Sequence, residues 1–127
     1  MQENLQQFVF IVDDDESVRR SMKRLLRSAG FQAETFASAQ EFLDADRSYE
    51  GACVVADVMM PGLGGLDLRE RLAGMGSTIP VILVTAYDTD ETREQAKSLG
   101  VAGYFRKPVD DQALLDAIQW ALEKGTV

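Results

Sequence analysis

The chain of 127 residues has the length of a single domain. Its 13 lysines and arginines stand against 21 aspartates and glutamates, so the net charge is −8, which argues against direct binding to a nucleic-acid backbone. The sequence holds no histidine and one cysteine, which excludes an internal disulfide, His/Cys zinc sites and catalytic triads or pairs built on histidine.

The first elements follow a polar segment, residues 1–7, that lacks the apolar core of a signal peptide. No apolar run approaches the roughly 20 residues needed to span a bilayer, so we expect a cytoplasmic protein with no membrane span.

Residues 8–12 are continuously apolar and end at three aspartates, which predicts a strand buried on both faces of a parallel sheet. Apolar positions at helical spacing over 16–29, followed by Gly30, predict the first helix.

The same alternation of strand and helix then repeats. Residues 32–36 alternate weakly, as in a short edge strand. Ser38, followed three residues later by Glu41, predicts a capping box at the start of a second helix. The apolar run 53–56 predicts a third, buried strand that ends at Asp57.

The second half of the chain continues this pattern to its end. Pro80 introduces the clearest strand, and Lys107-Pro108 ends the last one. The predicted elements are a helix marked by Leu68, Leu72 and Met75, a strand over 81–84, a polar helix over 90–99, a strand over 102–105, and a last helix capped by Asp110 with a core stripe of Leu114, Leu115, Ile118 and Leu122.

Five strands alternating with five helices predict a doubly wound α/β fold: a five-stranded parallel sheet with helices on both faces. We expect the flavodoxin-like strand order 2-1-3-4-5. No linker-like segment divides the sequence, so residues 1–127 are expected to form one domain.

Reactive side chains follow four of the five predicted strands. Asp13 and Asp14 come after the first strand, Asp57 ends the third, Thr85 the fourth, and Lys107 follows the fifth. Ligands of open α/β sheets bind beyond the carboxyl ends of the strands, where the strand order reverses. The expected order brings the three aspartates together at that point.

Three carboxylates so close need a proton or a cation, because two charges about 4 Å apart repel by roughly 4 kcal/mol at an effective dielectric of about 20. With oxygen ligands and no histidine, Mg²⁺ is the expected ion. A carboxylate beside a divalent ion, a lysine and a hydroxyl can attack phosphorus and form an aspartyl phosphate. We expect Asp57 to be the nucleophile, because it ends the central strand and precedes a permissive loop, with Lys107 and Thr85 assisting.

Four motifs occur in order along the chain. They are Ile11-Val12-Asp13-Asp14, Asp57 with Met60-Pro61 and Gly65, Val84-Thr85-Ala86, and Tyr104-Phe105-Arg106-Lys107-Pro108. Together they resemble the receiver domain of two-component response regulators, and the resemblance runs from Phe8 to about Glu123. The sequence is also similar to the receivers of nitrogen-fixation-type transcriptional regulators.

The resemblance implies a phosphorylation-dependent switch and not a free-standing enzyme. Asp57 would take a phosphoryl group from a sensor histidine kinase, a histidine phosphotransfer protein or a small phosphodonor, and the chain would catalyse only its own phosphorylation and dephosphorylation. The conformational change would control an output domain, a partner or a homodimer. Because the chain itself has no histidine, the phosphoryl group must come from another molecule.

The resemblance also implies roles for individual residues. Asp14, Asp57 and the backbone carbonyl of Met59 would bind Mg²⁺ directly, and Asp13 would act through water. Lys107, whose bond to the following proline is commonly cis in this family, would hold the phosphate. Thr85 and Tyr104 would form the switch pair.

Two departures from the usual family pattern have consequences. Met59 and Tyr87 occupy positions where the family often carries groups that help a water attack the phosphate, so we expect slow spontaneous dephosphorylation. The pair Gly64-Gly65 replaces the usual single glycine and predicts a more mobile loop.

Two alternatives stay open at this point. Asp13-Asp14-Asp15 contains an Asp-x-Asp that resembles the nucleophile motif of haloacid-dehalogenase-type phosphatases, in which Asp13 would be the Mg²⁺-dependent nucleophile and Asp57 would have no role. A passive doubly wound binding module would show no Mg²⁺-dependent labelling. Asp14 and Asp15, taken alone, are equally well explained as helix caps.

Overall fold

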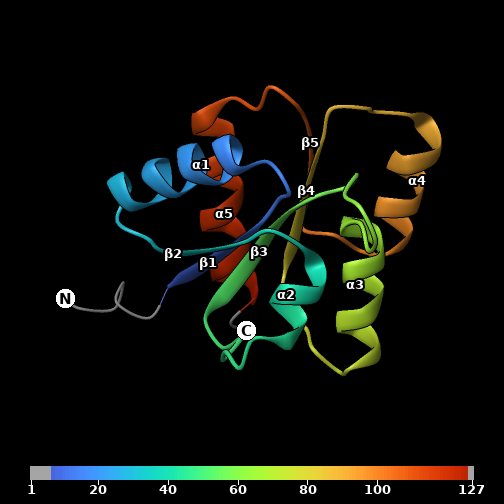
Figure 1. Cartoon of the computed structure of the whole chain (residues 1–127), viewed down its shortest axis with the longest axis horizontal. Helices are drawn as coiled ribbons and strands as arrows, with labels where there is room; N and C mark the ends of the chain where they lie inside the picture. Colours follow the sequence, from blue (N-terminus) through green and yellow to red (C-terminus); the bar gives the residue numbers. More distant parts are fainter. Residues whose placement is uncertain (1–6, 126–127) are drawn as a thin grey trace.

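A five-stranded, all-parallel sheet in the order β2-β1-β3-β4-β5 is the centre of the computed structural model, which describes residues 7–125 (Figure 1). Both the fold class and the strand order predicted from the sequence are confirmed. The strands are β1 (Phe8–Val12), β2 (Gln32–Phe36), β3 (Ala52–Asp57), β4 (Val81–Thr85) and β5 (Gly103–Arg106), and the helices are α1 (Glu16–Ser28), α2 (Ala39–Asp44), α3 (Gly65–Gly74), α4 (Asp90–Ser98) and α5 (Asp111–Gly125).

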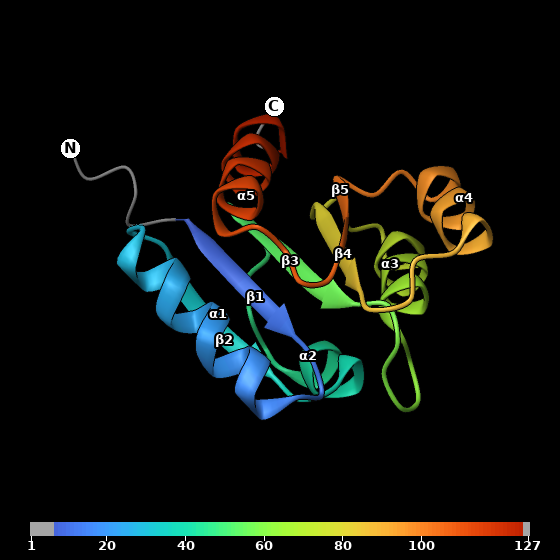
Figure 2. The same cartoon turned by 90° about the horizontal axis from the view of Figure 1, so that it is seen from above.

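The helices cover both faces of the sheet (Figures 1 and 2). Leu26 of α1 and Ile118 of α5 pack with one set of strand side chains, whereas Phe42 of α2, Leu72 of α3 and Ala96 of α4 pack with the other. Because successive side chains of a strand point to opposite faces, the central strands bury both sets, and every residue of β3 and β4 is buried.

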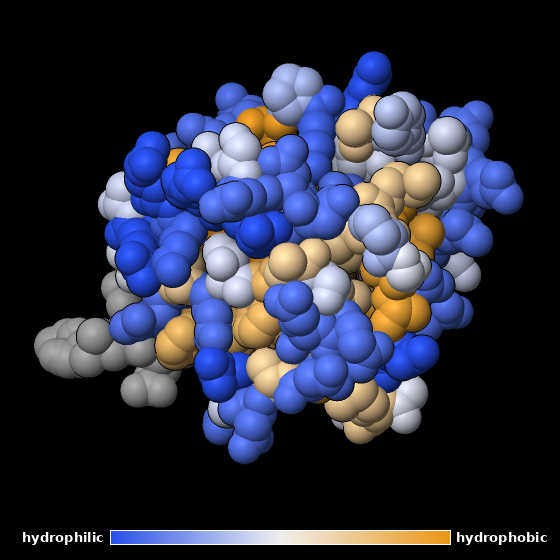
Figure 3. All heavy atoms as spheres, viewed as in Figure 1, coloured by the Kyte–Doolittle hydropathy of each residue, from blue (hydrophilic) through white to orange (hydrophobic). Residues whose placement is uncertain are grey.

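The face of the molecule seen in Figure 3 is largely polar. In the space-filling view, hydrophilic residues cover most of the region over α1, and apolar residues show mainly between the helices (Figure 3). Among the described residues, none of the helices is long and apolar enough to cross a membrane.

Local capping explains where two of the helices begin. The Ser38 hydroxyl accepts the Glu41 N–H at 3.1 Å, as predicted, but the Glu41 carboxylate accepts the N–H of Ala37 and not that of Ser38. At α5, Asp110 accepts the N–H of Ala113 at 2.9 Å, which confirms the predicted cap.

The third helix ends earlier than the sequence predicts. Met75 is one of the residues that mark this helix in the sequence, but α3 ends at Gly74 and Met75 is 60% exposed. The chain turns away at Gly76, whose φ of +81° favours glycine.

The expectation of a loose loop at Gly64-Gly65 is not supported by the packing there. A Cβ on Gly64 would collide with the backbone oxygen of Val58, and one on Gly65 would lie 2.7 Å from Leu83 Cδ2 and 2.8 Å from the carbonyl oxygen of Asp57. The Gly65 N–H donates to Val58 at 3.3 Å. These glycines therefore let the start of α3 approach the end of β3 closely.

We expect Gly65→Ala to destabilise the chain by about 1–3 kcal/mol, because the added methyl group overpacks a buried site beside rigid backbone. Gly74→Ala is the matched control, since a Cβ there meets nothing within 4 Å and should stabilise the helix by about 0.5–1 kcal/mol. Urea denaturation of both variants measures the difference. Equal stabilities would contradict this account of the loop.

Candidate functional site

The predicted site residues that follow or end the strands meet at the carboxyl edge of the sheet, as the strand register requires. Val12 of β1 pairs with Ala56 of β3, so Asp13 and Asp57 follow at the same level. Asp57 pairs with Val84 of β4, which Thr85 follows. The N–H of Lys107 donates to the Thr85 carbonyl at 2.7 Å, which fixes the backbone after β5 beside β4.

Three carboxylates form the acidic part of the site. Carboxylate oxygens of Asp13, Asp14 and Asp57 lie within 4.8 Å of one another. Asp13 and Asp57 are buried, with 1% and 7% of the residue exposed, whereas Asp14 is exposed to solvent. The structure thus brings together the three aspartates predicted from the strand ends.

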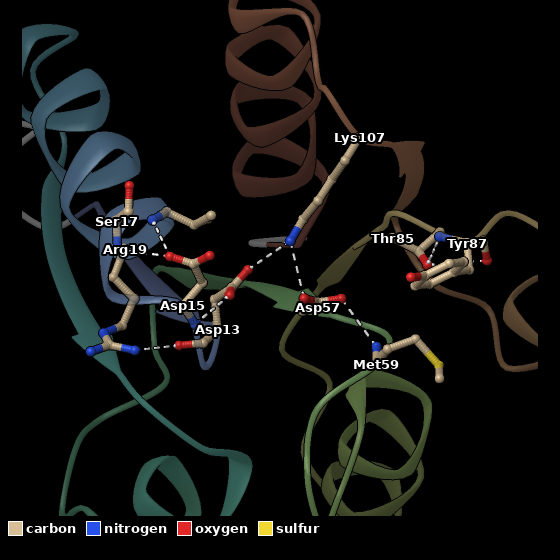
Figure 4. Close-up of polar contacts among 10 residues, drawn as sticks. Asp13, Asp15, Ser17, Arg19, Asp57, Met59, Thr85, Tyr87 and Lys107 are labelled. Atoms are coloured by element: carbon tan, nitrogen blue, oxygen red, sulfur yellow. Dashed lines mark hydrogen bonds and ion pairs between the residues drawn. The ribbon is translucent and has the colours of Figure 1, made fainter.

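Lys107 lies between the two buried carboxylates (Figure 4). Its Nζ is 3.1 Å from Asp13 Oδ2 and 3.0 Å from Asp57 Oδ2. Burial alone would lower the pKa of Lys107, but hydrogen bonds and charges from the two carboxylates outweigh burial and raise the pKa. Lys107 therefore stays an ammonium, and three carboxylates with one ammonium leave the site with a surplus of two negative charges.

Burial shifts the pKa of Asp13 in the opposite direction, because here the charged form is the deprotonated one. It raises the pKa of this carboxyl group, and the Asp15 N–H and the Lys107 ammonium only partly oppose it. A further cation nearby would stabilise the charged form of this buried carboxylate. Oxygen-only donors of this kind match the preference of hard divalent ions, so the acidic cluster is compatible with Mg²⁺.

The loop after β1 is held by contacts that the sequence did not reveal. The Asp13 carboxylate accepts the Asp15 N–H at 2.9 Å, and Arg19 donates to the Asp13 carbonyl at 2.7 Å (Figure 4). Asp15 caps α1 by accepting the N–H groups of Ser17 and Val18 at 2.8 and 3.2 Å. Of the two aspartates with a possible capping role, Asp15 is thus the cap of α1 and Asp14 lies in the acidic cluster.

The second oxygen of Asp57 is oriented by its own loop. Asp57 Oδ1 accepts the Met59 N–H at 3.0 Å, while Oδ2 contacts Lys107. The Met59 side chain is 58% exposed. The Lys107–Pro108 bond is cis, as the resemblance implied.

The hydroxyl groups of Thr85 and Tyr104 make their hydrogen bonds outside the cluster of Asp13, Asp14 and Asp57 in this structure. The Thr85 hydroxyl is buried; it donates to the Tyr87 carbonyl at 3.2 Å and accepts the Tyr87 N–H at 3.0 Å. The Tyr104 hydroxyl donates to Asp88 Oδ1 at 3.0 Å. Within residues 7–125, no hydrogen bond joins Thr85 or Tyr104 to Asp57.

Comparisons with known proteins agree with this geometry. The sequence model of the response regulator receiver domain matches residues 9–119. The transcriptional regulatory protein TdiR of Thauera aromatica is 43% identical over 90% of this chain and 50% of its own length, and FixJ of Azorhizobium caulinodans is 38% identical over 92% and 56%. The chain thus spans about half the length of these curated relatives.

Solved structures show the same fold. The response regulator StyR superposes with a TM-score of 0.86 at 42% identity, over 94% of this chain and 60% of StyR. The crystal structure of FixJ-N gives a TM-score of 0.82 at 30% identity, over 92% of this chain and 94% of FixJ-N. Similarity to FixJ agrees with the expected nitrogen-fixation-type subgroup.

These findings decide between the alternatives. The haloacid-dehalogenase-type alternative is not supported, because the matched family is a different one. A passive binding module is likewise disfavoured, because the family is that of phosphoacceptor switches in two-component systems. The chain belongs to the response regulator receiver domain family.

Proposed function

We propose that residues 1–127 form a single receiver domain in which Asp57 accepts a phosphoryl group from the phosphohistidine of a partner kinase or phosphotransfer protein. The domain would regulate an output and catalyse only its own phosphorylation and dephosphorylation. The observation that carries this proposal is the buried Asp57 carboxylate, 3.0 Å from Lys107 and inside a cluster of three carboxylates.

The transfer needs little from the protein beyond position and charge. A carboxylate oxygen of Asp57 would form a bond to phosphorus as the phosphorus–nitrogen bond of phosphohistidine breaks, and the electron pair of that bond would stay on the imidazole nitrogen. The Met59 N–H already holds one carboxylate oxygen of Asp57. Lys107 would turn its ammonium from the carboxylates to the incoming phosphoryl oxygens.

Mg²⁺ would be held by Asp14, Asp57 and the Met59 carbonyl, with Asp13 acting through water. When bound, the ion would neutralise charge on the carboxylates and on the transferred phosphoryl oxygens. The all-oxygen donor set and the two surplus negative charges support this assignment.

The acyl phosphate would drive the switch by its charge. The phosphoryl group carries close to two negative charges, roughly one more than the carboxylate that it replaces, and three acceptor oxygens. The Thr85 hydroxyl would exchange the Tyr87 carbonyl for a phosphoryl oxygen, and Tyr104 would turn inward. The movement of Thr85 and Tyr104 would reach α4, which is weakly anchored because Ala96 is the one residue of this helix that is buried. From α4 the change would reach an output domain, a partner or a second copy.

The first test is chemical labelling. A small phosphodonor with Mg²⁺ should label the wild-type chain, and Asp57→Asn should abolish the label because it removes the nucleophile. Asp44→Asn, an exposed carboxylate on α2, should label normally. Reduction of the acyl phosphate and mass spectrometry locate the label, and labelling of another aspartate in the wild type would contradict the proposal.

Metal binding has its own test. Mg²⁺ should raise the thermal midpoint of the wild-type chain, with about 2.7 kcal/mol of stabilisation at a hundredfold excess over the dissociation constant. Asp14→Asn should be more stable than wild type without Mg²⁺, because it relieves repulsion, and should lose the response to Mg²⁺. The control is Asp116→Asn on α5, and a full Mg²⁺ response in Asp14→Asn would disprove the assignment.

The phosphorylated state should persist for minutes or longer. Met59, which is 58% exposed, has no carboxylate or amide that could position a water on the phosphate, and Tyr87, which is 70% exposed, presents an aromatic side chain at the other position. Loss of the label over time measures the rate. Met59→Asn should hydrolyse faster, whereas Met75→Asn, an equally exposed methionine after α3, should not; a wild-type lifetime of seconds at room temperature would contradict the expectation.

A further inference from the structure

One carboxylate outside the cluster of Asp13, Asp14 and Asp57 connects the loop after β4, helix α4 and strand β5 through hydrogen bonds. Asp88 lies in the loop after β4, three residues beyond Thr85. Its Oδ1 accepts the Tyr104 hydroxyl of β5 at 3.0 Å and the Arg93 guanidinium of α4 at 2.9 Å. A single oxygen atom thus links the loop, the helix and the edge strand.

The contacts of Asp88 are better shielded than other ion pairs in this region. The Asp88 side chain is 20% exposed, whereas Asp90, the other carboxylate that Arg93 contacts at 2.9 Å, is 97% exposed. Exposed pairs contribute little, because solvent screens them. The Arg93 hydrogen bond, and secondarily that of Tyr104, lower the pKa of Asp88 despite its partial burial, so it remains an anion that accepts from both partners.

Tyr104 lies where its movement must disturb this contact. It pairs in register with Leu83 of β4 and packs against the hydrophobic cluster that contains Ala96 of α4. The same loop that carries Asp88 also holds the Thr85 hydroxyl through the Tyr87 carbonyl and N–H. A state in which Thr85 faces a phosphoryl group and Tyr104 turns inward gives up the bond between Tyr104 and Asp88.

We propose that the Asp88 carboxylate is a positioning residue that holds Tyr104 in the position seen here and so sets how readily the domain switches. This inference rests on the proposed function, since it assumes that Thr85 and Tyr104 respond to a phosphoryl group on Asp57. Asp88 touches neither the acidic cluster nor Lys107, and its effect is exerted through Tyr104.

A contact present in only one of two states biases their equilibrium against the other. Removing it raises the population of the switched state, and a ligand that binds this state then binds more tightly by up to the same factor. A net hydrogen bond of ordinary strength corresponds to a change of roughly threefold to tenfold. The expected phenotype is therefore tighter binding of a phosphoryl mimic, a gain that general damage to the fold would not produce.

The test is calorimetric titration of trifluoroberyllate, with Mg²⁺ held in excess, into the wild-type chain and its variants. Asp88→Ala and Tyr104→Phe should each lower the dissociation constant by about threefold to tenfold. The double variant should bind no more tightly than the stronger single variant, because both changes remove the same hydrogen bond between Tyr104 and Asp88. Asp90→Ala, which removes the solvent-exposed carboxylate that Arg93 also contacts, is the matched control and should bind trifluoroberyllate as the wild type does.

Two further measurements separate a positioning role from a structural one. The affinity for Mg²⁺ alone should be the same in all variants, because the ion does not contact Tyr104. Asp88→Asn, which keeps the side-chain shape and loses the charge, should tighten trifluoroberyllate binding by less than Asp88→Ala does.

The outcomes distinguish this inference from the function on which it rests. Wild-type dissociation constants in Asp88→Ala and Tyr104→Phe, with normal binding to the wild-type chain, would overturn the role of Asp88 and leave Asp57 as the phosphoacceptor. Trifluoroberyllate binding to Asp57→Asn, or its failure to bind the wild type, would overturn both.

Discussion

Repulsion among three carboxylates at one edge of the sheet is the constraint on which the rest of the structure depends. At an effective dielectric of about 20, two like charges about 4 Å apart repel by roughly 4 kcal/mol. Lys107 offsets part of that cost by contacting both buried members, and the Asp15 and Met59 N–H groups each take one further oxygen. The remaining negative charge makes the site compatible with a divalent cation.

The parallel sheet is what can hold such a cluster. Because β1 and β3 are neighbours and run in the same direction, Asp13 and Asp57 lie at one level, and burial on both faces keeps them in place. Lys107 arrives from β5, two strands from β3, and its backbone N–H is tied to Thr85 at the end of β4. The close approach at Gly65 fixes the loop on the other side of Asp57.

Sequence alone could predict what depends on periodicity and strand ends. Buried runs and helical spacing predicted the elements and their order, and the strand ends predicted the meeting of Asp13, Asp57 and Lys107. Contacts that depend on the path of a loop could not be predicted. Arg19 and Asp88 resembled ordinary surface charges, and the packing of Gly64-Gly65 depends on an approach of backbones that composition does not encode.

The most direct test of the central claim is a crystal structure of this chain grown with Mg²⁺ and trifluoroberyllate. The account predicts beryllium bonded to a carboxylate oxygen of Asp57, a fluorine within hydrogen-bond distance of Lys107 Nζ, and Mg²⁺ bound by Asp14, Asp57 and the Met59 carbonyl. Beryllium on Asp13, or a magnesium ion outside the three-carboxylate cluster, would contradict it.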